Sequence, residues 1–280
     1  METALSFLPA GSWRLLLVAA VFSAMILWEC LAPRRPLVQR RVTRWSAHLA
    51  LAAINTAVVR LAFPAASVGV ALFAEQRELG LLRHAGLSDA VTLVLALVLL
   101  DLVMYFQHLL FHTVPLLWRL HLVHHADPEF DVTTGIRFHP LEMLASACVK
   151  ALAIVLIGAP VLAVILFEIV LTSMSLFTHA NIRLPARLDR ALRWFAVTPD
   201  MHRIHHSIAV AESNSNFGFN LTWWDRLLGT YRHAGRSPQT EMTFGVAQFQ
   251  EAKLNVPLWG LLRLPFVDGA PPRQDTASRV

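Results

Sequence analysis

Residues 90–125, AVTLVLALVLLDLVMYFQHLLFHTVPLLWRLHLVHH, join a long apolar run directly to two histidine motifs. Asp101 is the single charged residue before the first motif, and the run is long enough to cross a bilayer as a helix. The motifs are His108-x-x-x-His112 and His121-x-x-His124-His125, and His202-x-x-His205-His206 repeats the second spacing later. On a helix, each spacing gathers its imidazoles on one face. The stretch therefore predicts a membrane helix that ends in a cluster of histidines.

The composition indicates an integral membrane protein. Only 15% of the 280 residues are charged, whereas a soluble domain carries about 25%. Long apolar runs occupy residues 13–31, 47–73, 90–111 and 141–177. We expect an all-α protein with about four transmembrane helices and a cytosolic helical cap that holds a di-metal histidine site. The last two helices, which flank Gly158-Ala159-Pro160, form either complete spans or a re-entrant hairpin.

Arginine sets the expected orientation in the membrane. The loop after the first run holds Arg34, Arg35, Arg40, Arg41 and Arg44, whereas residues 74–88 hold two arginines offset by acids. The positive-inside rule then places the first loop, and by alternation all three histidine motifs, in the cytoplasm. Because arginine greatly outnumbers lysine, as in GC-rich bacterial genomes, we expect a multi-pass protein of a bacterial inner membrane. We expect the first run to be a retained helix rather than a cleaved signal peptide, since residues 1–12 lack Lys and Arg.

The chain is expected to divide into three regions. Residues 1–88 form the N-terminal transmembrane helices and loops, residues 89–235 the metal-binding domain, and residues 236–280 a C-terminal cytosolic tail that is disordered from Asp268 onward. Within the second region, residues 183–196 carry arginines on one helical face and leucines on another. This pattern predicts a helix in the membrane interface, or alternatively an ordinary surface helix. Thr198-Pro199-Asp200 predicts a new helix just before the third histidine motif.

The histidines predict two metal ions. Imidazole suits iron, zinc, copper and nickel, and the motifs hold more histidines than one metal can use. His139 and His179 flank the last apolar run and should emerge at the same membrane surface. His139 is either a direct ligand or a hydrogen-bonding neighbour. Three carboxylates are candidates to accept the second N–H of a ligand and so fix its tautomer: Asp101, Glu142 and Asp225.

Several stretches carry a specific resemblance. They are residues 118–125 (WRLHLVHH), 137–142 (RFHPLE), 198–207 (TPDMHRIHHS), 216–218 (NFG) and 224–230 (WDRLLGT). In this order they resemble the fatty acid hydroxylase/sterol desaturase superfamily of membrane non-haem di-iron enzymes, over about residues 95–232. The resemblance implies a small helical membrane bundle with a cytosolic cap. The implied ligands of two iron ions are His108, His112, His121, His124, His125, His139, His179, His202, His205 and His206.

One position departs from the pattern of this superfamily. Its fatty acid 2-hydroxylases have a further histidine four residues before the position of His179, where this chain has Ser175. Either His139 or a water then completes the ligand set. Asn181 either holds a metal-bound water or caps a helix or turn.

The resemblance also implies the chemistry. O2 would be activated at the reduced irons, and hydrogen would be taken from an unactivated C–H bond of a membrane lipid with a sterol-like or fatty acyl structure. Hydroxyl rebound would give an alcohol, and loss of a second hydrogen an alkene. The chain has no flavin or nicotinamide fingerprint, so electrons would come from a ferredoxin- or cytochrome-type donor with its reductase. The arginine-rich face would dock that donor or attract anionic lipids. No nucleic-acid partner is expected.

Two other functions compete with a lipid oxygenase. A zinc-dependent membrane hydrolase would need an open zinc site with a general base, but the HExxH motif is absent. A histidine-rich metal transporter would line a path through the bilayer, whereas these motifs lie beyond the ends of the spans. Arg60, inside the second apolar run, either meets a polar group in a cavity between the spans or marks a bent or shorter span.

Overall fold

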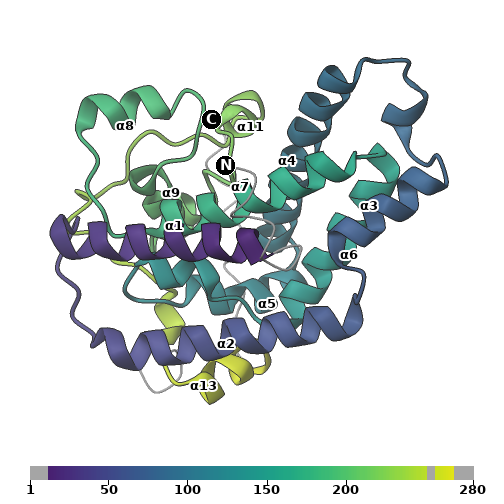
Figure 1. The fold of residues 1–280 in the computed structure, drawn as a ribbon. Helices are drawn as coiled ribbons and strands as arrows, with labels where there is room; N and C mark the ends of the chain where they lie inside the picture. The colour runs from purple at the N-terminus through teal and green to yellow at the C-terminus, as the bar shows by residue number, and fades with distance from the viewer. Residues whose placement is uncertain (1–11, 251–255, 268–280) are drawn as a thin grey trace.

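The computed structural model describes residues 12–250 and 256–267, which form helices and no β-strand. The long helices are α1 (Ser12–Leu31), α2 (Arg41–Ala62), α3 (Ala66–Gln76), α4 (Asp89–Thr113), α6 (Pro140–Ile157) and α7 (Val161–His179). The short elements are η1 (Leu81–His84), α5 (Pro115–His125), η2 (Val132–Ile136), α8 (Ala186–Leu192), α9 (Pro199–His205), α10 (Val210–Ser213), α11 (Trp223–Leu227), η3 (Ala247–Phe249), α13 (Leu258–Arg263) and η4 (Leu264–Phe266). Figure 1 shows α3, α4 and α6 on one side of the molecule and α8, α9 and α11 on the other. The expected all-α class is confirmed.

Five helical segments of the described chain are long and apolar enough to cross a membrane, so this is a multi-pass membrane protein. They are Trp13–Leu31, Arg41–His84, Asp89–Thr113, Pro140–Ile157 and Val161–His179. The second of these comprises α2, α3 and η1, with an interruption around Pro64. About four were expected, and both arms around Gly158 are helices of 18 and 19 residues, long enough for complete spans rather than a shallow hairpin.

Small residues allow the membrane helices to pack closely. Ala71, Ala96, Ala153 and Ala163 are buried between α3, α4, α6 and α7. Because lipid is as apolar as leucine, membrane helices gain more from close backbone approach than from hydrophobic burial. The tightest approach joins the loop after α3 to the α6–α7 turn, where a Cβ on Gly80 would lie 2.1 Å from the Gly158 backbone nitrogen. Both glycines have positive φ, which other residues rarely adopt.

The helices α5, α9 and α10 form a cap at the end of the bundle where α4 and α7 end, with α5 against α4 and α9 against α7. Thr198 caps α9 by accepting a hydrogen bond from the Met201 amide, which confirms the predicted start of this helix. The helix predicted over 183–196 is shorter, Ala186–Leu192. Arg193 does not lie on a free polar face, because it is buried and pairs with Asp189 at 2.8 Å.

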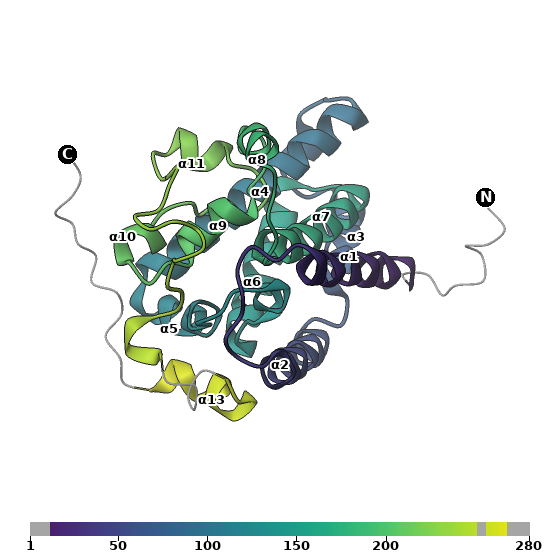
Figure 2. The same cartoon turned by 90° about the vertical axis from the view of Figure 1, so that its left-hand side faces the viewer.

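The described residues after 235 pack onto this cap and onto α2. Met242 and Phe244 form a buried cluster with Phe130, and α13 lies beside α2 (Figure 2). Leu261 and Leu264 pack against apolar side chains of α2 and α5. The tail from Asp268 onward, expected to be disordered, lies outside the described residues.

Candidate metal centre

Nine buried histidines form two adjacent groups. The first group is His108, His112, His121, His125 and His205; the second is His124, His179, His202 and His206. Within each group, one ring nitrogen of every member lies within 4.8 Å of those of the others. The helices α4, α5, α7 and α9 supply eight of them, and His206 directly follows α9. Each HxxHH motif divides between the groups. This division holds the groups side by side, with the rings of His125 and His206 stacked at 4.3 Å.

Hydrogen bonds at the outer nitrogens fix the tautomers of four histidines. Each Nδ1 lies 2.6–2.8 Å from an oxygen, in the pairs His108–Phe217 O, His121–Glu142 Oε1, His179–Ser175 O and His205–Ser215 O. Carbonyl and carboxylate oxygens only accept hydrogen bonds, so in these rings Nδ1 donates and carries the proton. Their Nε2 atoms therefore present lone pairs, which is how second contacts orient histidine ligands around a metal.

The inner nitrogens have the spacing that a metal ion requires. His179 Nε2 lies 3.1, 3.2 and 3.0 Å from the Nε2 atoms of His124, His206 and His202. Nitrogens that bind one ion at about 2.1 Å are roughly 3.0–3.4 Å apart. In the first group, His121 Nε2 and His205 Nε2 are buried without a hydrogen-bond partner. Buried imidazole nitrogens at this spacing, some of them without any other partner among the described residues, form donor sets that fit two metal ions.

The protein environment keeps the cap histidines neutral. Burial lowers the pKa of His205 to about 3. Burial and the neighbouring imidazoles also lower the pKa values of four others well below 6.5: His124, His125, His202 and His206. Metal binding needs the unprotonated ring, so these side chains are ready to bind at neutral pH.

The structure does not bring His139 into either group. This residue caps α6, and its Nδ1 accepts a hydrogen bond from the Leu141 amide. Its Nε2 faces the Leu262 carbonyl at 3.3 Å. Both ring nitrogens are therefore engaged away from the metal groups, in contrast to the direct ligation implied by the resemblance.

Ser175 and Asn181 hold the backbone beside His179. Ser175 donates its hydroxyl to the Gly135 carbonyl, and its own carbonyl accepts from His179. Asn181 exchanges hydrogen bonds with the Arg35 backbone through its side chain, a contact between distant segments rather than a helix or turn cap. Its amide donates to buried Glu29 at 2.6 Å, so α1 is tied to the end of α7.

The three candidate carboxylates have different roles. Glu142 contacts His121 as expected, at 2.6 Å. Asp101 does not contact a histidine of the centre; it accepts from Trp224 Nε1 and Asn220 Nδ2, both at 2.8 Å. These contacts fasten both α11, through Trp224, and the loop before it, through Asn220, to α4.

Asp225 acts on the metal centre through the backbone. It accepts hydrogen bonds from the amides of Phe217 and Gly218, at 2.7 and 2.8 Å. The Phe217 carbonyl in turn accepts from His108. Burial raises the pKa of Asp225 to about 6. Gly218 allows the close approach, since a Cβ there would lie 2.7 Å from the Asp225 carboxylate.

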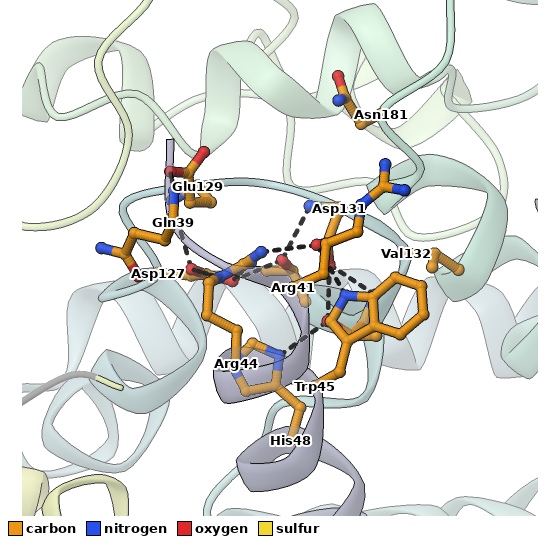
Figure 3. Close-up of polar contacts among 12 residues, drawn as sticks. Gln39, Arg41, Arg44, Trp45, His48, Asp127, Glu129, Asp131, Val132 and Asn181 are labelled. Atoms are coloured by element: carbon orange, nitrogen blue, oxygen red, sulfur yellow. Dashed lines mark hydrogen bonds and ion pairs between the residues drawn. The ribbon is translucent and has the colours of Figure 1, made fainter. Parts of the chain in front are cut away.

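A buried ionic network next to the centre was not predicted from the sequence. Arg44 of α2 pairs with Asp127 and Asp131 at 2.6 Å each, as Figure 3 shows. His48 Nδ1 contacts the Thr133 hydroxyl at 2.9 Å in the same network. The available signal was the acidic segment 126–131, ADPEFD, directly after the second histidine motif.

The network supports the second histidine group. Arg137, 3.4 Å from Asp127, donates to the Val123 carbonyl, directly before His124 in the chain. The neighbouring Phe138 stacks on the His124 ring at 4.4 Å. The ion pairs therefore hold the 126–138 segment against His124, a member of the second histidine group.

A cavity of about 470 Å³ lies against the first histidine group. His108, His121 and Glu142 line one end, and Arg60 and Lys150 also line it. Its wall is mainly apolar, with Met104, Phe111, Phe138, Leu171 and Phe219. Its size is typical of a small-molecule site. Arg60 lines this cavity, which was one of the two positions expected for it from the sequence.

This geometry defines the class of protein: a helical membrane protein with two buried histidine groups beside an apolar cavity. Residues 93–230, about half of the chain, match the family model described as fatty acid hydroxylase. The chain belongs to the fatty acid hydroxylase/sterol desaturase superfamily, as its histidine motifs indicated.

The relatives named after their activity are lipid hydroxylases and monooxygenases. An ornithine lipid hydroxylase of Rhizobium tropici is 34% identical over 55% of this chain and 45% of its own length. Human cholesterol 25-hydroxylase is 28% identical over 51% of this chain and 52% of its own. Alkylglycerol monooxygenase of Xenopus tropicalis is 28% identical over 45% of this chain and 27% of its own length. The chain thus spans about half or less of the length of these relatives. No solved structure gives a significant match.

Proposed function

We propose that the protein is an O2-dependent membrane monooxygenase that hydroxylates an unactivated C–H bond of a membrane lipid. The observation that carries this proposal is the cavity whose apolar wall leads to His108 and His121. A lipid chain in that cavity would bring a C–H bond next to the buried histidine groups. The activities named for the relatives favour hydroxylation over desaturation.

The proposed ligand set is nine histidines without His139. The first group offers five nitrogens, which exceeds the four ligands usual for protein-bound zinc, and imidazole suits iron. When bound, two irons supply the redox chemistry that reduces O2. Hydroxylation inserts one oxygen atom into the C–H bond and reduces the other to water. It therefore consumes two electrons and two protons, the electrons from a ferredoxin- or cytochrome-type donor with its reductase.

The chain itself orients the ligands and keeps the site dry. Glu142 holds the proton of His121 on Nδ1 and increases the basicity of its Nε2. Phe111, Phe138 and Phe219 line the cavity and exclude water from the reacting carbon. Asp225 keeps the Phe217 carbonyl aligned on His108 through the loop.

We place the site on the cytoplasmic side of a bacterial inner membrane. The arginines after α1 support this orientation, although three of them contact other parts of the protein. Arg34 pairs with Asp200, Arg35 donates to the Met242 carbonyl and Arg44 is part of the buried network. Arg40 and Arg41 remain to support the positive-inside argument.

Lipid analysis under 18O2 tests the proposal. Cells that express the chain should accumulate one lipid class with a single added 18O atom, and cells that express His202→Ala should not. Equal lipid profiles in the two strains would contradict the proposal. So would zinc-dependent hydrolysis by the purified protein in anaerobic buffer, which the hydrolase alternative predicts.

A further inference from the structure

The cavity has a polar part that oxygen chemistry does not explain. We infer that it binds an amphiphile with an acidic group, a carboxylate or a phosphate, which Arg60 holds while the chain extends toward His108 and His121. This inference rests on the proposed function only for the reaction of the lipid chain. The acid-binding site follows from the residues that line the cavity.

The position of the site follows from α6. Glu142, Ser146 and Lys150 lie at intervals of four residues and all line the cavity. Eight residues of α-helix rise about 12 Å, so Lys150 marks a layer roughly that far from the Glu142–His121 contact. From α2, Arg60 lines the same cavity, and Asn55 does so about 8 Å earlier along the helix axis.

Two cations line the cavity, and Arg60, the exposed one of the two, has no carboxylate partner within the described chain. Lys150 is 3.6 Å from Glu168, so this pair is close to neutral. Among the residues that the structure describes, no carboxylate lies within ion-pair distance of Arg60. An arginine within a membrane segment is costly unless it pairs, and such residues usually mark substrate paths. Guanidinium binds carboxylate and phosphate equally well through two parallel hydrogen bonds.

Two buried amide oxygens in the cavity wall have no hydrogen-bond donor in the part of the chain that the structure describes. Asn55 and Gln107 are both more than nine-tenths buried. Asn55 Nδ2 donates to the Phe138 carbonyl and Gln107 Nε2 to Ser146, but both side-chain oxygens lack a partner. Buried carbonyl oxygens are normally satisfied. A ligand with an amide N–H or a hydroxyl along its chain would satisfy them while its acid reaches Arg60.

Binding measurements on the purified full-length protein test this inference. The probe is a fluorescent fatty acid, displaced by three competitors of equal chain length: a carboxylic acid, its methyl ester and a lysophospholipid with a terminal phosphate. The wild type should bind the better acid at least about tenfold more tightly than the ester, as expected for a charge-assisted contact. The acid that binds more tightly identifies the head group.

Three variants separate a specific site from general lipid binding. Arg60→Gln should remove the preference for the acid over the ester and leave the affinity for the ester unchanged. Glu168→Gln should increase the preference for the acid, because it frees Lys150. Arg77→Gln is the matched control, because this exposed arginine does not line the cavity. Equal wild-type affinities for both acids and the ester, or a full preference in Arg60→Gln, would overturn the inference.

The binding result is independent of the proposed reaction, since it is measured on protein stripped of metal by a chelator as well as on protein as isolated. Acid preference without 18O incorporation would contradict the proposed function alone. 18O incorporation into a neutral lipid, unaffected by Arg60→Gln, would contradict the acid site alone.

Discussion

Replacing Arg44 with methionine should destabilise the protein severely. The guanidinium lies 2.6 Å from both Asp127 and Asp131, and all three side chains are at most 1% exposed. Removal of one partner of a buried ion pair costs about 3–5 kcal/mol, because the remaining charge stays buried. Two pairs are lost, but Arg137 stays 3.4 Å from Asp127. We therefore expect the free energy of unfolding to fall by about 3–5 kcal/mol rather than by twice that amount.

The measurement is a denaturant titration in detergent micelles, with Arg41→Met as the matched control. Arg41 is on the same helix, but its side chain is 32% exposed and lies 4.0 Å from Glu29. Glu29 is buried, but it also accepts hydrogen bonds from the Val132 and Asn181 amides, so loss of this long contact should cost less than loss of Arg44. If Arg44→Met cost no more than Arg41→Met, the network would not stabilise the segment after the second histidine motif.

Three further changes test the centre. Glu142→Gln should weaken one of the two bound metals about 10- to 100-fold in chelator competition, because His121 loses its carboxylate partner; equal release of both metals would contradict this role. Gly135→Ala should lower metal content, since its Cβ would lie 2.6 Å from the Ser175 carbonyl that orients a ligand. Gly235→Ala should not, since its nearest neighbour would be the end of the Met242 side chain at 3.2 Å and the next ones lie at 3.5 Å. Metal-stripped protein should lose stability between pH 7 and 5. The adjacent histidines of the two HxxHH motifs have lowered pKa values when folded, so below pH 6.5 the unfolded chain binds more protons. The loss should approach roughly 1.4 kcal/mol per histidine per pH unit in calorimetry at stepped pH, and a flat profile would show that the rings are not buried neutral.

The sequence predicted which histidines gather but not how they divide. Helical spacing places His121, His124 and His125 on one face, and the membrane pattern places all three motifs at one surface. Their division into groups of five and four depends on how α5 and α9 face each other, which periodicity does not contain. His139 shows the same difficulty, because its place in the sequence suited a ligand while the start of α6 uses its ring as a cap.

The buried network lay beyond sequence reasoning for a different reason. Arg44 is 83 and 87 positions from its two partners, and the sequence offered it as a cytoplasmic charge in an arginine-rich loop. Only the packing of α2 against the segment after α5 turns this charge inward. The orphaned acceptors of Asn55 and Gln107 are likewise properties of the assembled cavity.

Metal content is the measurement that tests the two-metal centre most directly. Elemental analysis of the purified protein, with His179→Ala and His121→Ala alongside, should give two irons per wild-type chain. Each variant should hold one, because these residues belong to different histidine groups. A single metal ion in the wild type, or the loss of both ions in both variants, would contradict two separately held metals.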